Sequence, residues 1–176
     1  TLEPMNCFDI HTHHIPLHPE QAILACSIKD MPLPETGIIS VGIHPWHLTE
    51  KNADEQLHWL EKMVKQPGVV AIGECGMDKL RSISMDKQIK ILRECIMLSE
   101  ETSLPVIIHA VKCTEELIRI KKDMKPQMPW IIHGFRGKAS VAKSLLDQGI
   151  HLSFGEYYQK DSLRYTPLDR LFLETD

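Results

Sequence analysis

The sequence lacks the cysteine spacing and the long apolar runs that mark several protein classes. Its five cysteines are scattered and form no C-x-x-C pair, which argues against a zinc finger and against a disulfide framework. Its longest apolar runs have the length of a strand, far short of the roughly 18 residues of a membrane-spanning helix. Because no basic stretch precedes an apolar run near the first residue, we expect a cytoplasmic protein without membrane contact.

The sequence also has no excess of positive over negative charge. Twenty Lys and Arg residues stand against 24 Asp and Glu residues, for a net charge of −4, so no general basic field is available to hold nucleic acid. Any phosphate must therefore be bound at a local site. The ordinary composition over 176 residues predicts a single globular domain spanning residues 1–176. Nothing in it points to an obligate protein partner.

What the sequence does have is a series of short apolar runs. Most are apolar on consecutive residues, which is typical of strands buried on both faces of a parallel sheet. Helical spacing of apolar residues fills the later gaps, as at Leu57, Leu60 and Val64. The eight runs are Cys7–Ile10, Ile23–Ile28, Ile38–Ile43, Val69–Gly73, Val106–His109, Trp130–His133, Ile150–Phe154 and Leu171–Glu174. Eight strands that alternate with helices predict an α/β fold, a compact TIM-like (β/α)8 barrel.

The two ends of this barrel depart from the usual pattern. Segments 11–22 and 29–37 are short and each holds two prolines, so we expect the first two βα units to be shortened and to lack proper helices. Segment 29–37 is below the dozen residues of a usual parallel crossover, which leaves an antiparallel second strand open. The sequence ends at Asp176, with the eighth run, so we expect the last helix to be missing.

Ligand-type side chains fall at the ends of these runs. His11 and His13 stand two apart, so along a strand they project to one face, where both can meet one ion. Glu74 follows the run 69–73 between two glycines. In a parallel barrel the carboxyl ends of the strands converge on the face that carries the active site. The candidate metal ligands are His11, His13, Glu74, His109, His133 and Asp176.

Each of these residues has a simpler explanation when taken alone. A single histidine at a strand end is commonly hydrogen-bonded, and Glu74 alone reads as a solvated loop acid. Together they favour a metal site, because buried charges at one end of a barrel are costly without a cation.

Further residues near these ends are candidates for substrate contact. His44 ends the third run and is placed to donate to a phosphate, whereas its alternative role is to hold its loop. Trp46 is placed to stack on a base or to anchor the same loop. Arg136 and Lys112 follow ligand histidines and supply local positive charge, unless they are solvated cations. Asp78 is placed to orient a ligand histidine from behind or to cap the next segment.

The motifs as a set resemble the TatD family of metal-dependent hydrolases, a branch of the amidohydrolase-like TIM barrels. In chain order they are D-I-H-T-H at 9–13, V-G-I-H-P at 41–45, A-I-G-E-C-G-M-D at 71–78, P-V-I-I-H at 105–109, I-I-H-G-F-R-G at 131–137, L-S-F-G at 152–155 and R-L-F-L-E-T-D at 170–176. They cover nearly the whole chain.

The resemblance implies a two-metal phosphodiesterase, such as a deoxyribonuclease that hydrolyses DNA from an end. Two divalent ions (Zn, Mg, Mn or Ni) are then expected, with DNA or a small phosphoester as substrate. By this resemblance His11, His13 and Asp176 hold one ion, while His109 and His133 hold the other. Glu74 bridges the two ions.

Catalysis is expected to depend on Asp176, Glu74 and His44. Two ions can activate a water and stabilise both oxygens of an in-line displacement, and we expect Asp176 to act as the general base. The chain departs from the family pattern at Arg136 and Lys112, so its substrate contacts are expected to differ. Two alternatives stay open, namely a binuclear hydrolase of C–N or carboxylic ester bonds and a non-catalytic barrel.

Overall fold

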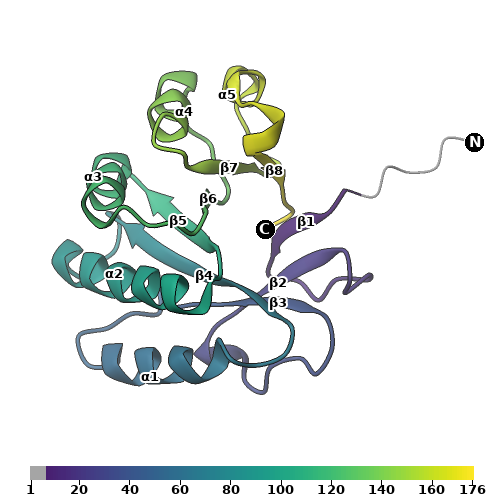
Figure 1. The fold of residues 1–176 in the computed structure, drawn as a ribbon, viewed down its shortest axis with the longest axis vertical. Coiled ribbons are helices and arrows are strands. Elements are labelled where there is room, and N and C mark those ends of the chain that lie inside the picture. The colour runs from purple at the N-terminus through teal and green to yellow at the C-terminus, as the bar shows by residue number, and fades with distance from the viewer. Residues whose placement is uncertain (1–6) are drawn as a thin grey trace, which may run out of the picture.

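The computed structural model describes residues 7–176 and shows a closed barrel of eight parallel strands (Figure 1). Each strand pairs with the next along the chain, and the first pairs with the last. The strands are β1 (Asp9–Thr12), β2 (Ala22–Cys26), β3 (Ile38–Val41), β4 (Val69–Asp78), β5 (Val106–Val111), β6 (Trp130–Ile132), β7 (His151–Phe154) and β8 (Leu171–Leu173). The expected TIM-like barrel is thus confirmed.

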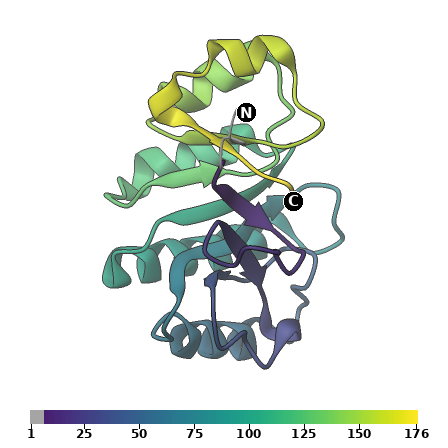
Figure 2. The ribbon, with the colours of Figure 1, turned by 90° about the vertical axis from the view of Figure 1, so that its right-hand side faces the viewer.

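Helices cover only part of this barrel. The α-helices are α1 (Ala53–Met63), α2 (Met85–Thr102), α3 (Thr114–Met124), α4 (Ala139–Leu146) and α5 (Lys160–Tyr165), and two 3-10 turns are η1 (Ile28–Asp30) and η2 (Leu168–Arg170). The α-helices lie around the outside from β3 onward, whereas β1 and β2 face outward with no helix of the described chain over them (Figures 1 and 2). The expected shortening of the first two units is confirmed, and no helix of residues 7–176 is long and apolar enough to cross a membrane.

The second strand is parallel to both of its neighbours, so the antiparallel alternative is wrong. The reason is that β2 ends at Cys26 and not at Ile28, which lengthens the connector toward the dozen residues that a parallel crossover usually needs. Ser27 and Asp30 cap η1 reciprocally, with the Ser27 amide donating to Asp30 Oδ2 at 2.7 Å. The connection from β2 to β3 therefore contains one 3-10 turn in place of a crossover helix.

Strand β4 runs further than the sequence predicts. It was expected to end at Gly73 but continues to Asp78, so Glu74 lies inside a strand. Gly73 and Gly76 have φ values of 155° and 150°, and a Cβ at Gly76 would overlap the carbonyl oxygen of His109. These glycines let β4 press against β5, with a register shift between Ile72 and Cys75. The irregularity is what turns Glu74 toward the site.

The barrel interior has an apolar floor and a polar mouth. Five side chains pack together at the floor: Ile10, Ile23, Ala71, Ile107 and Ile131. His109 and His133 stand two positions after Ile107 and Ile131, so strand alternation carries them onto the same inward face, one layer up. The larger apolar cluster, which includes Ile72, Leu92 and Trp130, packs between the strands and the helices. The fold therefore delivers the polar side chains to one end.

Candidate metal centre

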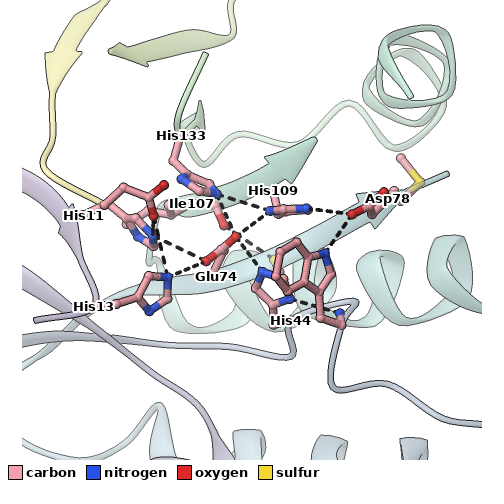
Figure 3. Close-up of polar contacts among 12 residues, drawn as sticks. His11, His13, His44, Glu74, Asp78, Ile107, His109 and His133 are labelled. Atoms are coloured by element: carbon pink, nitrogen blue, oxygen red, sulfur yellow. Dashed lines mark hydrogen bonds and ion pairs between the residues drawn. The ribbon is translucent and has the colours of Figure 1, made fainter. Parts of the chain in front are cut away.

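Glu74 occupies the centre of the polar mouth, and its side chain is only 4% exposed (Figure 3). Three histidine nitrogens surround its Oε1 atom. They are His109 Nδ1 at 2.7 Å, His133 Nε2 at 2.7 Å and His44 Nε2 at 2.9 Å. One carboxylate oxygen thus faces imidazoles delivered by the ends of β3, β5 and β6.

The other oxygen of Glu74 faces the end of β1. His13 Nε2 lies 3.1 Å and His11 Nε2 lies 3.4 Å from Glu74 Oε2. Asp176 Oδ1, just past β8, lies 3.6 Å from His11 Nε2 and 3.8 Å from His13 Nε2. The structure therefore brings all six candidate ligands together, and His44 joins them.

This donor set fits divalent metal ions. Both ring nitrogens of His11 are buried and have no hydrogen-bond partner among the described residues, as expected for a side chain shaped to bind something else. Imidazoles with carboxylates are typical ligands of zinc and related metals. Within residues 7–176, four groups have ligand atoms within 4.8 Å of one another: His11, Glu74 and His133; His11, His13 and Asp176; His44, Glu74 and His109; and His133, Glu174 and Asp176.

The charges of the cluster follow from this crowding. Burial alone would raise the pKa of Glu74, but the hydrogen bonds from His109 and the other histidines outweigh it and hold that pKa far below its usual range. Burial would lower the pKa of His133, yet the carboxylates of Glu174 and Glu74 raise it to about 10. His11, whose Nε2 lies 3.6 Å from Asp176 Oδ1, lowers the pKa of Asp176 to about 2. Without a cation, protons on imidazoles balance the carboxylates.

Asp9 ties the two strands that close the barrel. Its Oδ1 accepts the backbone N–H groups of His11 at 3.1 Å and Thr175 at 3.2 Å, and its Oδ2 accepts the Thr175 hydroxyl at 2.6 Å. The Asp176 N–H in turn donates to the His11 carbonyl at 3.0 Å. These bonds place His11 beside Asp176. Sequence reasoning missed Asp9, although its place at the head of D-I-H-T-H was an available signal.

Asp78 lies behind His109, on the side away from Glu74 (Figure 3). Its Oδ2 lies 3.4 Å from His109 Nε2 and accepts the indole N–H of Trp46 at 2.7 Å. The Arg81 guanidinium lies 3.7 Å from the centre of the Trp46 ring. The structure thus places Asp78 where it can orient a histidine, and it places Trp46 in a loop anchored to that carboxylate.

The predicted substrate cations lie in different settings. Arg136 is exposed and lines a cavity of about 160 Å³ that also borders Asp176. The Arg136 guanidinium lies 5.0 Å from the ring centre of Tyr157, which lines the same cavity. Lys112 is exposed just past β5, and no contact found among the described residues joins it to the cluster. Tyr157 was missed, although an aromatic pair after L-S-F-G was visible in the sequence.

Fold and site together define the class of protein. It is a closed parallel (β/α)8 barrel with a histidine and carboxylate centre at the carboxyl ends of its strands. The chain belongs to the family described as TatD related DNase, which matches residues 8–176. The resemblance drawn from the motifs is thereby confirmed.

Relatives of known name agree with this membership. The chain is 34% identical over 146 residues to an uncharacterized metal-dependent hydrolase, YabD, of Bacillus subtilis, covering 78% of this chain and 57% of that protein. It is 32% identical over 147 residues to the 3'-5' ssDNA/RNA exonuclease TatD of Erwinia amylovora, covering 78% and 56% respectively. The chain thus spans little more than half the length of these relatives.

A solved structure supports the same conclusion for the fold. The crystal structure of YJJV, a TatD homologue from Escherichia coli, superposes with a TM-score of 0.74 at 25% identity. The match covers 88% of this chain and 66% of that one.

Proposed function

We propose that the chain is a metal-dependent phosphodiesterase that cleaves single-stranded DNA or RNA from an end. The observation that carries the proposal is the cluster itself, in which buried Glu74 is ringed by five histidines with Asp176 at the opening. The names of relatives support it, since one is a metal-dependent hydrolase and another an ssDNA/RNA exonuclease.

The two oxygens of Glu74 suggest how two divalent ions are shared. Oε2 faces His11 and His13, while Oε1 faces His109 and His133. In this assignment Asp176 would join the first pair, and Glu74 would help to hold both ions. When bound, the ions would lower the pKa of a water and supply charge that stabilises the oxygens of the displaced ester. A histidine-rich set favours zinc or nickel over magnesium.

Asp176 and His44 have complementary proton roles in this proposal. His11, 3.6 Å from Asp176 Oδ1, lowers the pKa of Asp176 and so keeps the carboxylate ionised, the form that can take up a proton from the attacking water. The backbone N–H of Trp46 donates to His44 Nδ1 at 3.0 Å. The proton of a neutral His44 therefore lies on Nε2, which points into the site. Burial lowers the pKa of His44 and keeps it neutral. His44 is thereby set to donate to a phosphate oxygen.

Nucleic acid contact is assigned to the rim of the site. Arg136 and Tyr157 offer a cation and an exposed ring beside Asp176, a pairing that suits a phosphate next to a stacked base. Trp46 is half exposed and Lys112 is exposed, and both are proposed as further contacts. We also propose a reducing, cytoplasmic setting, which the five free thiols support.

The test is cleavage of an end-labelled single-stranded oligonucleotide with added zinc, manganese or magnesium, beside a panel of carboxylic esters and amides. We expect metal-dependent removal of nucleotides from one end that a chelator abolishes. Turnover that a chelator does not affect, or hydrolysis confined to the ester and amide panel, would contradict the proposal.

The variant Asp176→Asn tests the proton role separately. With metal content retained, we expect kcat to fall about 10² to 10⁴-fold, the usual contribution of a positioned base. The control is Asp123→Asn, which removes an exposed ion pair between α3 and Arg93 of α2. Full turnover by metal-loaded Asp176→Asn would remove Asp176 from this role.

A further inference from the structure

Glu174 is a buried carboxylate that the assignment of ligands leaves unused. Its side chain is 0% exposed, and neither of its oxygens has a hydrogen-bond partner among residues 7–176. It faces His133, whose Nδ1 lies 3.4 Å from Glu174 Oε1. An ionised carboxylate in such a position is costly unless it serves a partner.

The surroundings of Glu174 are shaped to hold it there. The Glu174 N–H donates to the Phe154 carbonyl at 3.2 Å, which fixes its backbone beside β7. A Cβ added at Gly134 would lie 3.4 Å from Glu174 Oε1, and one at Gly155 would lie 3.5 Å from Glu174 Cγ. The two glycines therefore lie against this side chain, and a Cβ at either would reach ordinary van der Waals contact with it.

His133 has one nitrogen for each carboxylate. Its Nε2 lies 2.7 Å from Glu74 Oε1, in the centre of the cluster, and its Nδ1 faces Glu174. An imidazole that binds a metal through one nitrogen keeps a proton on the other, and a carboxylate that accepts this proton fixes the ring and its tautomer.

His109 shows the same arrangement with its nitrogens exchanged. Its Nδ1 lies 2.7 Å from Glu74 Oε1, and its Nε2 lies 3.4 Å from Asp78 Oδ2. The two histidines thus present opposite nitrogens to Glu74, each with a separate buried carboxylate behind it. Asp78 and Glu174 come from different strand ends, so one acid cannot replace the other.

We propose that Glu174 is a positioning residue that accepts the Nδ1 proton of His133 and holds His133 Nε2 toward a metal ion beside Glu74. The role rests on the part of the proposed function that makes His133 a metal ligand, and it is independent of the substrate. The competing role is direct ligation, since His133, Glu174 and Asp176 also have ligand atoms within 4.8 Å of one another.

The proton itself can be observed by NMR of the imidazole nitrogens in the zinc-loaded, ¹⁵N-labelled chain. We expect His133 to carry a slowly exchanging proton on Nδ1. Its resonance should change chemical shift in Glu174→Gln, and the proton should exchange faster with water in Glu174→Leu. A merely structural role of Glu174 would leave this signal unchanged. A His133 that carries no Nδ1 proton in the zinc-loaded chain would overturn the proposal and favour direct ligation.

Zinc affinity, measured against a competing chelator, is the second readout. We expect Glu174→Leu to weaken zinc binding about 10 to 100-fold, and Glu174→Gln, which keeps an acceptor oxygen, to weaken it less. Should the Leu variant fail to fold, the Gln variant alone must still bind more weakly than the wild type. The matched control is Glu156→Gln. Glu156 is an exposed acid that lines the cavity beside Arg136 and Glu174, and the variant should bind zinc like the wild type.

The outcomes separate this proposal from the proposed function. Unchanged zinc affinity in both Glu174 variants overturns the role of Glu174 alone. A wild-type chain that binds no zinc overturns the metal centre and this role with it. A chain that binds zinc, shows the expected affinities and cleaves no phosphodiester overturns the substrate assignment and supports the role of Glu174.

Discussion

At the scale of single residues, the chemistry of the site is set by crowding around one carboxylate. The hydrogen bonds that lower the pKa of Glu74 come from the same histidines that would bind metal. The same contacts, with Glu174, raise the pKa of His133 to about 10. Protons and metal ions therefore compete for the same nitrogen atoms.

This competition predicts a pH dependence of metal binding. Because the folded pKa of His133 lies above its usual 6.5, the bound proton stabilises the metal-free chain fully below pH 6.5, and that contribution is lost as the pH rises toward about 10. A cation must displace this proton, so apparent zinc affinity should rise with pH, about tenfold per unit for one proton. Competition titrations from about pH 6.5 to about pH 8.5 measure it. An affinity independent of pH would contradict the raised pKa.

The variant Glu74→Gln tests the centre of the cluster. An amide removes the charge that the histidines share, so we expect zinc affinity to fall at least about 100-fold, and the metal-free chain to lose about 3 to 5 kcal/mol of stability. Calorimetric zinc titration and chemical denaturation measure the two effects. Glu116→Gln, which removes an ion pair with Lys79, is the control and should bind zinc normally. Zinc binding by Glu74→Gln at wild-type strength would exclude Glu74 as a ligand.

The sequence could predict the members of the cluster because each ends an apolar run, and runs of a parallel barrel end on one face. It could not predict the roles of Glu174 and Asp9, because their partners lie on other strands and strand register cannot be derived from the sequence alone. Asp9 binds Thr175, which is far along the chain, and Glu174 looks in the sequence like one more strand residue. Spacing alone does not reveal which acid faces which imidazole nitrogen.

At the scale of elements, the decisive feature is the close approach of β4 and β5. A side chain at Gly76 has no room beside the His109 carbonyl, and its φ of 150° is one that other residues rarely adopt. The same contact positions His109 beside Glu74. Backbone packing and site geometry are therefore coupled at this pair of strands.

The variant Gly76→Ala should cost about 3 kcal/mol or more, since overlap and backbone strain each cost about 1 to 3 kcal/mol. It should also weaken zinc binding, because His109 must move. The control is Gly155→Ala, where the nearest atom would lie 3.5 Å from the new Cβ, and we expect a change within about 0.5 kcal/mol. Equal stability of the two variants in urea denaturation would show that β4 and β5 do not need this contact.

Elements were predictable where apolar runs were continuous, and their ends were less so. In the sequence the apolar run 69–73 ends at a glycine followed by an acid. In the structure β4 continues to Asp78, and Glu74, Cys75 and Met77 are all buried. The sequence does not fix the orientation of β2, because a connector that holds only one 3-10 turn with a capping box is shorter than a usual parallel crossover.

At the scale of the whole molecule, the candidate metal centre joins the strands that close the barrel. Its candidate ligands come from the ends of β1, β5, β6 and β8 and from within β4. Bound ions would therefore stabilise the closed form as well as support chemistry, since a ligand that binds only the folded chain stabilises it.

Removing metal should thus lower the melting temperature. An ion present at 100 times its Kd adds about 2.7 kcal/mol, which for a chain of this size corresponds to a fall in Tm of about 5 to 10 °C when a chelator is added. Scanning calorimetry with and without the chelator measures the shift. In Glu74→Gln the chelator should have little effect, and an equal fall in that variant would trace the shift to another site.

The metal centre itself is tested most directly by the metal content per chain, measured by elemental mass spectrometry on protein purified without an affinity metal. We predict about two divalent ions per wild-type chain and a loss of them in Glu74→Gln. A content near zero in the wild type, even after incubation with zinc, manganese, nickel and magnesium, would contradict the metal centre and leave a barrel whose histidines serve only one another.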